Sequence, residues 1–89
     1  MRQIIQSTKF KSDYKRMQKR GRKSAKLQAV IQLLLDDNPL PARCKPHKLG
    51  GNFAGFWECH IEPDWLLIYD VNDRYLELAA TGTHADLFD

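Results

Sequence analysis

The sequence lacks any apolar run near the ~20 residues that a membrane-spanning helix requires, and its longest candidate, residues 29–35, is far shorter. It also lacks a charged start followed by an apolar stretch and a small-residue cleavage site, the features of a secretory signal. Only two cysteines are present, Cys44 and Cys59, and without a secretory context we expect both to be free thiols. These absences predict a cytoplasmic protein without disulfides and without a membrane partner.

Acidic side chains are scarce in the first part of the chain. Residues 1–37 hold ten lysines and arginines against three aspartates, a net charge of +7, whereas residues 38–89 hold four against eight acids, a net charge of −4. A positive half of this density attracts phosphate backbones through counterion release, or an acidic protein partner through electrostatic steering. The alternative is a basic surface that is simply solvated.

The first half has the spacing of a strand followed by two helices. A short apolar segment at residues 3–5 predicts a strand, and Ser7 or Thr8 can cap the helix that follows. Phe10, Tyr14 and Met17 lie on one face of that helix, which we expect to end near Gly21. A wide apolar stripe predicts a second helix over residues 23–36, and the prolines of residues 38–41 end it.

After residue 41 the apolar spacing changes from about 3.6 to 2, which is typical of strands. We expect strands near residues 56–62, 65–71 and 74–81, joined by turns at 62–64 and 72–73, with Trp57 and Trp65 in the core. Residues 65–69 are continuously apolar, as in a central strand covered on both faces. The predicted fold is therefore α+β, one domain over residues 1–89 in which an N-terminal strand and a helical hairpin pack on a mostly antiparallel sheet.

All three histidines, His47, His60 and His84, fall in the second half of the chain. Two of them occupy polar turn contexts, residues 60–65 (HIEPDW) and 81–84 (TGTH). Each alone is more often a structural or surface residue, but strand ends of a twisted sheet can bring them together with Asp64. Because imidazole takes and gives protons near neutral pH, such a cluster predicts acid–base chemistry on the sheet face opposite the helices, which we expect to be exposed.

Two other kinds of site are weaker alternatives. Cys44, His47, Cys59 and His60 are possible metal ligands, but Cys59 and His60 are adjacent on a strand and point to opposite faces, so no metal is expected. The segment around residues 47–52 has the composition of a phosphate loop but not its spacing, and a flexible turn at residues 50–51 is the ordinary interpretation. Lys45 and Lys48 can still contact a phosphate.

The run from His47 to Phe88, above all residues 60–69 (HIEPDWLLIY) and 81–88 (TGTHADLF), resembles the YafQ branch of the RelE-like bacterial toxins. The resemblance implies a RelE-like fold and a ribosome-dependent endoribonuclease that cleaves messenger RNA without a metal or cofactor. It also implies a cognate antitoxin that blocks the site. It places five residues at positions used for catalysis or substrate placement, namely His47, His60, Asp64, His84 and Phe88.

Cleavage of this kind needs a base for the ribose 2′-hydroxyl and an acid for the leaving 5′-oxygen. We expect His60 and His84 to be the base and acid in either order, Asp64 to orient one of them, His47 to contact the phosphate and Phe88 to stack on a base. For RNA contact we assign the basic residues Lys9, Lys11, Lys15, Arg16, Lys19, Arg20, Arg22, Lys23, Lys45 and Lys48.

The sequence departs from the family pattern at two positions. Arginine is common in the family where this chain has Ala80, and frequent where it has Trp57. Loss of one stabilising cation can cost roughly 10²- to 10³-fold in rate, so the chain is either weakened or compensated by Lys45 or Lys48. Two rival hypotheses are a toxin of the same scaffold that poisons a partner such as DNA gyrase, and a small basic regulator that only binds nucleic acid.

Overall fold

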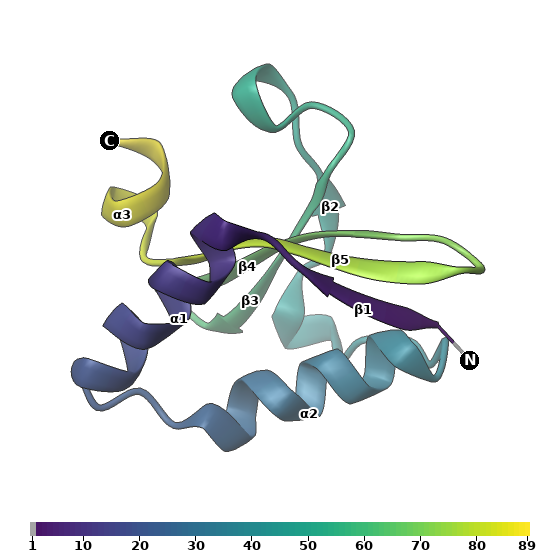
Figure 1. The fold of residues 1–89 in the computed structure, drawn as a ribbon, viewed down its shortest axis with the longest axis horizontal. Helices are drawn as coiled ribbons and strands as arrows, with labels where there is room; N and C mark the ends of the chain where they lie inside the picture. Colours follow the sequence, from purple (N-terminus) through teal and green to yellow (C-terminus); the bar gives the residue numbers. More distant parts are fainter. Residues whose placement is uncertain (1) are drawn as a thin grey trace.

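The computed structural model describes residues 2–89 and is built on a five-stranded sheet with the strand order β1-β5-β4-β3-β2 (Figure 1). The elements in chain order are β1 (Gln3–Gln6), α1 (Thr8–Lys19), α2 (Ser24–Leu35), the 3₁₀ turn η1 (Ala42–Cys44), β2 (His47–Lys48), the 3₁₀ turn η2 (Gly51–Phe53), β3 (Trp57–Glu62), β4 (Trp65–Val71), β5 (Tyr75–Gly82) and α3 (His84–Phe88). Strand β1 runs parallel to β5, and the other neighbours are antiparallel. The predicted α+β class and mostly antiparallel sheet are confirmed.

The two long helices form as their sequences predict. The Ser7 hydroxyl caps α1 by accepting a hydrogen bond of 2.9 Å from the Phe10 amide. Gly21 follows the end of α1 with a φ of 83°, a left-handed conformation that glycine adopts without a steric penalty. Both α1 and α2 lie on one side of the sheet (Figure 1) and bury their apolar stripes there.

A polar contact fixes α1 against β5 within the core that lies between the two long helices and the sheet, the helix-side core. Asp13 is almost fully buried, and its carboxylate accepts a hydrogen bond from the Thr81 amide while Lys9 pairs with it from the same helix. The Thr81 hydroxyl accepts a hydrogen bond of 2.9 Å from the Trp65 indole and donates one to the Leu66 carbonyl. Buried polar groups with all their partners present fix one arrangement of the elements. These bonds therefore determine how the start of α1 sits over the end of β5.

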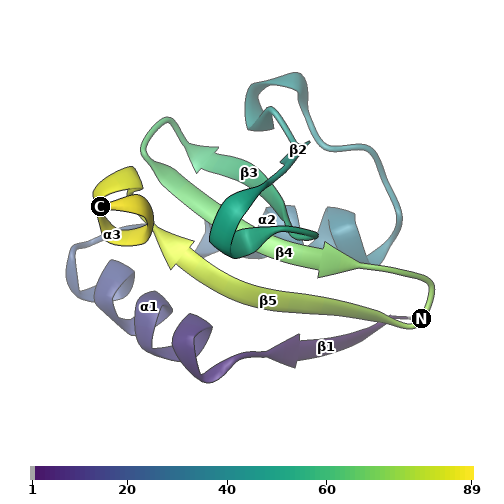
Figure 2. The ribbon, with the colours of Figure 1, turned by 90° about the horizontal axis from the view of Figure 1, so that it is seen from above.

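The opposite face of the sheet is also partly covered. Because Trp65 and Leu67 belong to the helix-side core, alternation along β4 directs Leu66 and Ile68 to the other face, where both are nonetheless fully buried. The loop containing η2 and the helix α3 rise on this side (Figures 1 and 2). The central strand is thus covered on both faces, as its continuous apolar run predicted, but the opposite face is not the fully exposed surface expected from sequence.

A groove remains between the two covering segments. The rings of Phe53 and Phe88 meet edge to face with centroids 5.9 Å apart, and a cavity of about 460 Å³ lies between the η2 loop and the end of α3. Strand β2 and both 3₁₀ turns were not predicted, because segments of two or three residues are too short to show a periodicity. Among residues 2–89, no helix combines the length and the apolar character needed to span a membrane.

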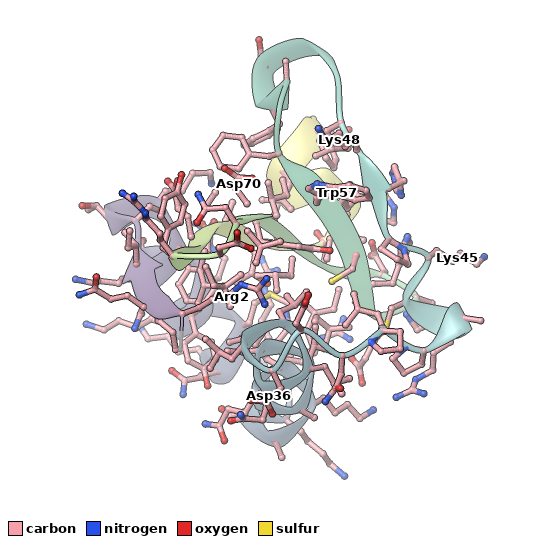
Figure 3. All side chains as sticks on the ribbon, turned by 90° about the vertical axis from the view of Figure 1, so that its right-hand side faces the viewer. Arg2, Asp36, Lys45, Lys48, Trp57 and Asp70 are labelled. Carbon is pink, nitrogen blue, oxygen red and sulfur yellow. The ribbon has the colours of Figure 1, made fainter. Side chains whose placement is uncertain are left out.

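The two tryptophans and the two cysteines take different places in this structure. Trp65 is fully buried as predicted, whereas Trp57 lies at the margin of the core with the Lys48 ammonium 5.8 Å from its ring centroid (Figure 3). Cys44 and Cys59 are buried and free, as expected, and burial raises the pKa of both thiols. Both thiols are therefore poor nucleophiles and poor metal ligands at neutral pH.

Candidate active site

Three separate elements bring the histidines together. His47 lies on β2, His60 on β3 and His84 at the start of α3, and the ring centroids of His60 and His84 are 5.9 Å apart. A carboxylate oxygen of Glu58 lies 3.4 Å from Nε2 of His47 and 3.8 Å from Nε2 of His60. The predicted convergence of the imidazoles is therefore present, with Asp64 beside His84.

His84 and Asp64 form a hydrogen-bonded pair. The ring Nδ1 of His84 lies 2.6 Å from a carboxylate oxygen of Asp64, and the backbone amide of His84 donates to the same oxygen over 2.9 Å. These two bonds hold the pKa of Asp64 below its ordinary value, and the bond from the backbone amide has the larger effect. Because an ionised carboxylate only accepts, Nδ1 carries a hydrogen, and Nε2 is left free to exchange a proton with a substrate.

Backbone carbonyls fix the other two rings. Nδ1 of His60 lies 3.2 Å from the Pro63 carbonyl, and Nδ1 of His47 lies 2.9 Å from the Lys45 carbonyl. A carbonyl only accepts, so both Nδ1 atoms are donors and both Nε2 atoms face Glu58. Lys45 has a φ of 45°, a left-handed backbone that is rare outside glycine. Such backbone conformations concentrate at functional sites, and this one is at the residue whose carbonyl orients His47.

Glu58 is the one member of the cluster to which sequence reasoning gave no role. It is a charged residue only 5% exposed, and in the strand register it stands directly opposite His47. The signal was available, because Glu58 precedes His60 by two residues and period-2 alternation places both on one face of β3. A carboxylate this buried requires hydrogen-bonded or charged neighbours, and the nearest candidates here are the two imidazoles.

Helix α3, which carries His84, is held in place by its first turn. Thr83 and Asp86 form a capping box, in which the Thr83 hydroxyl accepts from the Asp86 amide and the Asp86 carboxylate accepts from the Thr83 amide. Arg20, just after α1, donates two hydrogen bonds of 2.6 and 3.1 Å to the Asp86 carboxylate. These bonds are the main reason why the pKa of Asp86 lies well below its usual range. Gly82 leaves room for this contact, because a Cβ there would lie 2.9 Å from the Cβ of Asp86.

Replacing Asp86 with asparagine is expected to lower the melting temperature at pH 7 by roughly 4–8 °C, the equivalent of about 1 kcal/mol in a domain of this size, a figure that allows for solvent screening. A carboxyl whose pKa is depressed on folding stabilises the protein above its ordinary value of 3.8, and this contribution is lost as the pH falls below that value. The difference in melting temperature between the native protein and Asp86→Asn should therefore stay constant from pH 6 to about pH 4 and shrink progressively below it, down to pH 2. Asp73→Asn, at an exposed turn, is the matched control, and a difference that does not shrink at all between pH 4 and pH 2 would contradict the ion pair as its source.

Several residues assigned to RNA contact also connect elements of the fold. Lys9 and Arg16 pair with Asp13, Arg20 pairs with Asp86, and Arg22 pairs with Glu62 together with Lys26. The ion pairs of Arg22 and Lys26 hold the pKa of Glu62 below its ordinary value. Six lysines of the assigned set are exposed and form no salt bridge within residues 2–89, namely Lys11, Lys15, Lys19, Lys23, Lys45 and Lys48. These are the cations of the set that remain available to a polyanion.

The two arginines that the resemblance implies at the positions of Trp57 and Ala80 would lie on opposite faces of the sheet. Trp57 pairs in register with Tyr69 of the helix-side core, so it points away from Glu58 and His60. Ala80 pairs with Ile68 on the sheet face opposite α1 and α2, the groove face, and is fully buried. Only the substitution at Ala80 therefore removes a cation from the side of the sheet that carries the histidines.

The possible metal ligands do not assemble into one site. Cys59 is fully buried in the helix-side core, whereas His60, the next residue on β3, points to the groove face. Within the part of the chain that the structure describes, no group of three or more histidine, cysteine or acidic side chains is placed to hold a metal ion. What the site does offer is two neighbouring imidazoles with hydrogen-bonded Nδ1 atoms and two carboxylates, which is the equipment of acid–base chemistry.

The fold and site together define a small α+β protein with a histidine-based acid–base site. A family model described as the bacterial toxin of type II toxin-antitoxin system, YafQ, matches residues 2–89. The mRNA interferase toxin YafQ of Escherichia coli strain K12 is 43% identical over 88 residues, which cover 98% of this chain and 96% of that protein. The chain belongs to the YafQ family of bacterial toxins, and the resemblance seen in its sequence is confirmed.

Solved structures agree with this assignment. The crystal structure of YafQ from Escherichia coli strain BL21(DE3) matches with a TM-score of 0.93 at 41% identity, and the match covers 100% of both chains. The toxin chain in the crystal structure of the Escherichia coli DinJ-YafQ complex matches with a TM-score of 0.91 at 42% identity, again over 100% of both chains. The predicted RelE-like fold is therefore confirmed along the full length of the chain.

Proposed function

We propose that this protein is the toxin of a toxin–antitoxin pair and cleaves messenger RNA on the ribosome, with His60 and His84 as the acid–base pair. The observation that carries the proposal is the 5.9 Å separation of the two imidazole rings, with Asp64 hydrogen-bonded behind one of them. This spacing fits the two ends of one reacting nucleotide linkage. The name of the Escherichia coli relative, an mRNA interferase, supports the same reaction.

In the proposed reaction, Nε2 of His60 removes the proton from a ribose 2′-hydroxyl, and the oxygen attacks the adjacent phosphorus. The bond from phosphorus to the 5′-oxygen breaks, and Nε2 of His84 gives its proton to that oxygen, which leaves a 2′,3′-cyclic phosphate and a 5′-hydroxyl. Asp64 accepts from Nδ1 of His84 and so directs Nε2 of that ring at the leaving oxygen, which assigns His84 the acid role. A carboxylate oxygen of Glu58 lies 3.8 Å from Nε2 of His60, the nitrogen that takes up the proton.

The remaining predicted residues line the path of the RNA in this proposal. Phe88 lies four residues after His84 on α3 and, with Phe53, borders the groove where a base can stack. His47 contacts the phosphate, and the exposed lysines of α1 dock on ribosomal RNA. Because its substrate is messenger RNA bound to ribosomes, the protein acts in the cytoplasm. The DinJ-YafQ complex of Escherichia coli supports a cognate antitoxin that neutralises this chain.

The direct test maps RNA 5′-ends on translating ribosomes in the presence and absence of the purified protein. We expect new 5′-ends within the messenger RNA at positions aligned with ribosomes, and none in free RNA at the same protein concentration. Translation arrest without new ends would favour a toxin that only binds, and DNA damage after induction would favour a gyrase poison. Tight binding to free RNA with a steep salt dependence and no cleavage would favour the nucleic-acid-binding regulator.

The substitution Ala80→Arg is expected to raise the rate of cleavage at least tenfold, because it restores a cation to the groove face beside the histidines. Its stability should fall by about 1–3 kcal/mol, since Ala80 is fully buried and a larger side chain must displace its neighbours. Ala80→Met adds comparable bulk without charge and serves as the control. If both variants cleave at the rate of the native chain, the missing arginine does not limit this protein.

A further inference from the structure

A second cavity, separate from the Phe53–Phe88 groove, adjoins His60 at the open edge of β3. Strand β2 pairs only with Trp57 and Glu58, so the rest of β3 has no strand neighbour on that side. A pocket of about 390 Å³ occupies this edge. Its lining includes Lys26 of α2, Arg43 of η1, Lys45, His60, Glu62 and Pro63.

The pocket is strongly cationic. Arg43 and Lys45 are exposed and form no salt bridge within residues 2–89, and Lys26 shares Glu62 with Arg22. The lining therefore holds three cationic side chains and one carboxylate, and that carboxylate already has two ion-pair partners. The pocket carries a net positive charge. A concave cationic surface concentrates anions, and arginine in particular matches the geometry of a phosphate group.

The histidine cluster itself has no such charge. It contains the carboxylates of Glu58 and Asp64, no lysine or arginine within residues 2–89 forms a salt bridge with either, and Ala80 contributes no cation. An RNA strand brings further negative charge, so positive groups must lie next to the cluster. The cationic pocket meets this need, because His60 belongs both to the cluster and to the lining of the pocket.

The backbone links the pocket to the site a second time. The left-handed conformation of Lys45 turns its carbonyl towards Nδ1 of His47 while its side chain lines the pocket. On the far side of His60, Pro63 both lines the pocket and supplies the carbonyl that fixes the His60 ring. Figure 3 shows Lys45 at the edge of the molecule beside β2.

We propose that the pocket formed by Lys26, Arg43 and Lys45 binds the RNA phosphate next to the one that is cleaved. The inference rests on the proposed function and adds a binding subsite to it. In this arrangement the strand passes over His60, with the reacting linkage between His60 and His84 and one neighbouring phosphate in the pocket. The pocket thereby supplies the positive charge that the histidine cluster lacks.

The first test compares Arg43→Gln with Arg74→Gln, which removes the same charge from an exposed arginine at the β4–β5 turn. On programmed ribosomes, Arg43→Gln should lower kcat/KM about 10- to 100-fold, the loss typical of a hydrogen bond to a charged group. Arg74→Gln should stay within about twofold of the native protein. Both positions are exposed, so melting temperatures should match, and adding Lys45→Gln to Arg43→Gln should reduce cleavage further.

The second test locates the phosphate. Messenger RNA carrying a single uncharged methylphosphonate is prepared with the modification at the linkage on either side of the cleaved one. With the native protein, the methylphosphonate at one of the two linkages should lower kcat/KM about as much as the Arg43→Gln substitution does. With the Arg43→Gln protein, the same methylphosphonate should lower kcat/KM little further. Such non-additivity is the signature of direct contact between two groups.

The outcomes separate the pocket from the reaction. If the native protein does not cleave messenger RNA at all, the proposed function fails. If it cleaves, but Arg43→Gln behaves like Arg74→Gln, or the losses from the variant and the methylphosphonate multiply independently, the subsite is wrong. If Arg43→Gln leaves cleavage intact and instead weakens binding of an acidic antitoxin, the pocket is a protein-docking surface and the RNA subsite is again wrong.

Discussion

The substitution His84→Ala is expected to lower the rate of messenger RNA cleavage about 10²- to 10⁴-fold, the range typical of removing a general acid or base. The side chain is half exposed, and alanine is a good helix former at the start of α3, so the melting temperature should change little. Cleavage on programmed ribosomes, followed under single-turnover conditions, measures the effect. Phe88 and the basic residues remain in place, so binding of the ribosome should be unchanged.

The pH dependence of the same variant distinguishes a chemical role from a structural one. If His84 gives a proton to the leaving oxygen, the native rate falls at alkaline pH because the acid form is lost, and His84→Ala loses that limb of the profile. His47→Ala is the matched control, because it removes an imidazole that is predicted to contact the phosphate only. A His84→Ala protein that cleaves at the full rate, or that keeps the full pH profile, removes His84 from the mechanism.

The substitution Asp64→Asn is expected to lower the rate by about 10²-fold or more while leaving the fold intact. The Asp64 carboxylate accepts from Nδ1 of His84 and thereby leaves Nε2 facing the substrate. An asparagine amide can instead donate to Nδ1, which moves the hydrogen of the neutral ring to Nε2. Nδ1 then cannot carry a hydrogen while that bond lasts, so the ring with a hydrogen on both nitrogens, which acts as the acid, loses its partner. In the well-studied Ser-His-Asp site, the same change of tautomer costs about 10⁴-fold.

Nitrogen NMR of the His84 ring is the measurement that tests this explanation directly. In the native protein the neutral ring should carry its hydrogen on Nδ1, and in Asp64→Asn on Nε2. Asp70→Asn, a change of the same kind on the same sheet, should alter neither the rate nor the ring. A slow Asp64→Asn protein whose His84 keeps the native tautomer would indicate that Asp64 acts through charge, not through orientation.

The local elements of this fold follow from short-range features of the sequence. Ser7 caps α1 because its hydroxyl reaches the Phe10 amide three residues on, and the prolines after α2 end it because they lack an amide hydrogen. The alternation of Cys59, His60 and Ile61 placed His60 on the face opposite the helix-side core. The family resemblance, which depends on two contiguous segments, was visible for the same reason.

The composition of the site required long-range information. Glu58 meets His47 only through the pairing of β3 with β2, a two-residue strand that no periodicity reveals. The cationic pocket joins α2, η1 and β3, and Arg43 has no local feature that marks it as its member. Arg20 and Asp86 are 66 residues apart, and only the packing of α1 beside α3 makes them an ion pair.

The sequence by itself determined which residue types are available and which face of each helix and strand they occupy, because rotamers, caps and hydrophobic spacing act over a few residues. The tertiary structure alone decided which of these faces meet. The separation of His60 and His84, the position of Asp64 behind one imidazole and of Glu58 beside two, and the pocket at the edge of β3 all depend on strand register and helix packing. These are set by the whole core at once, and no short segment encodes them.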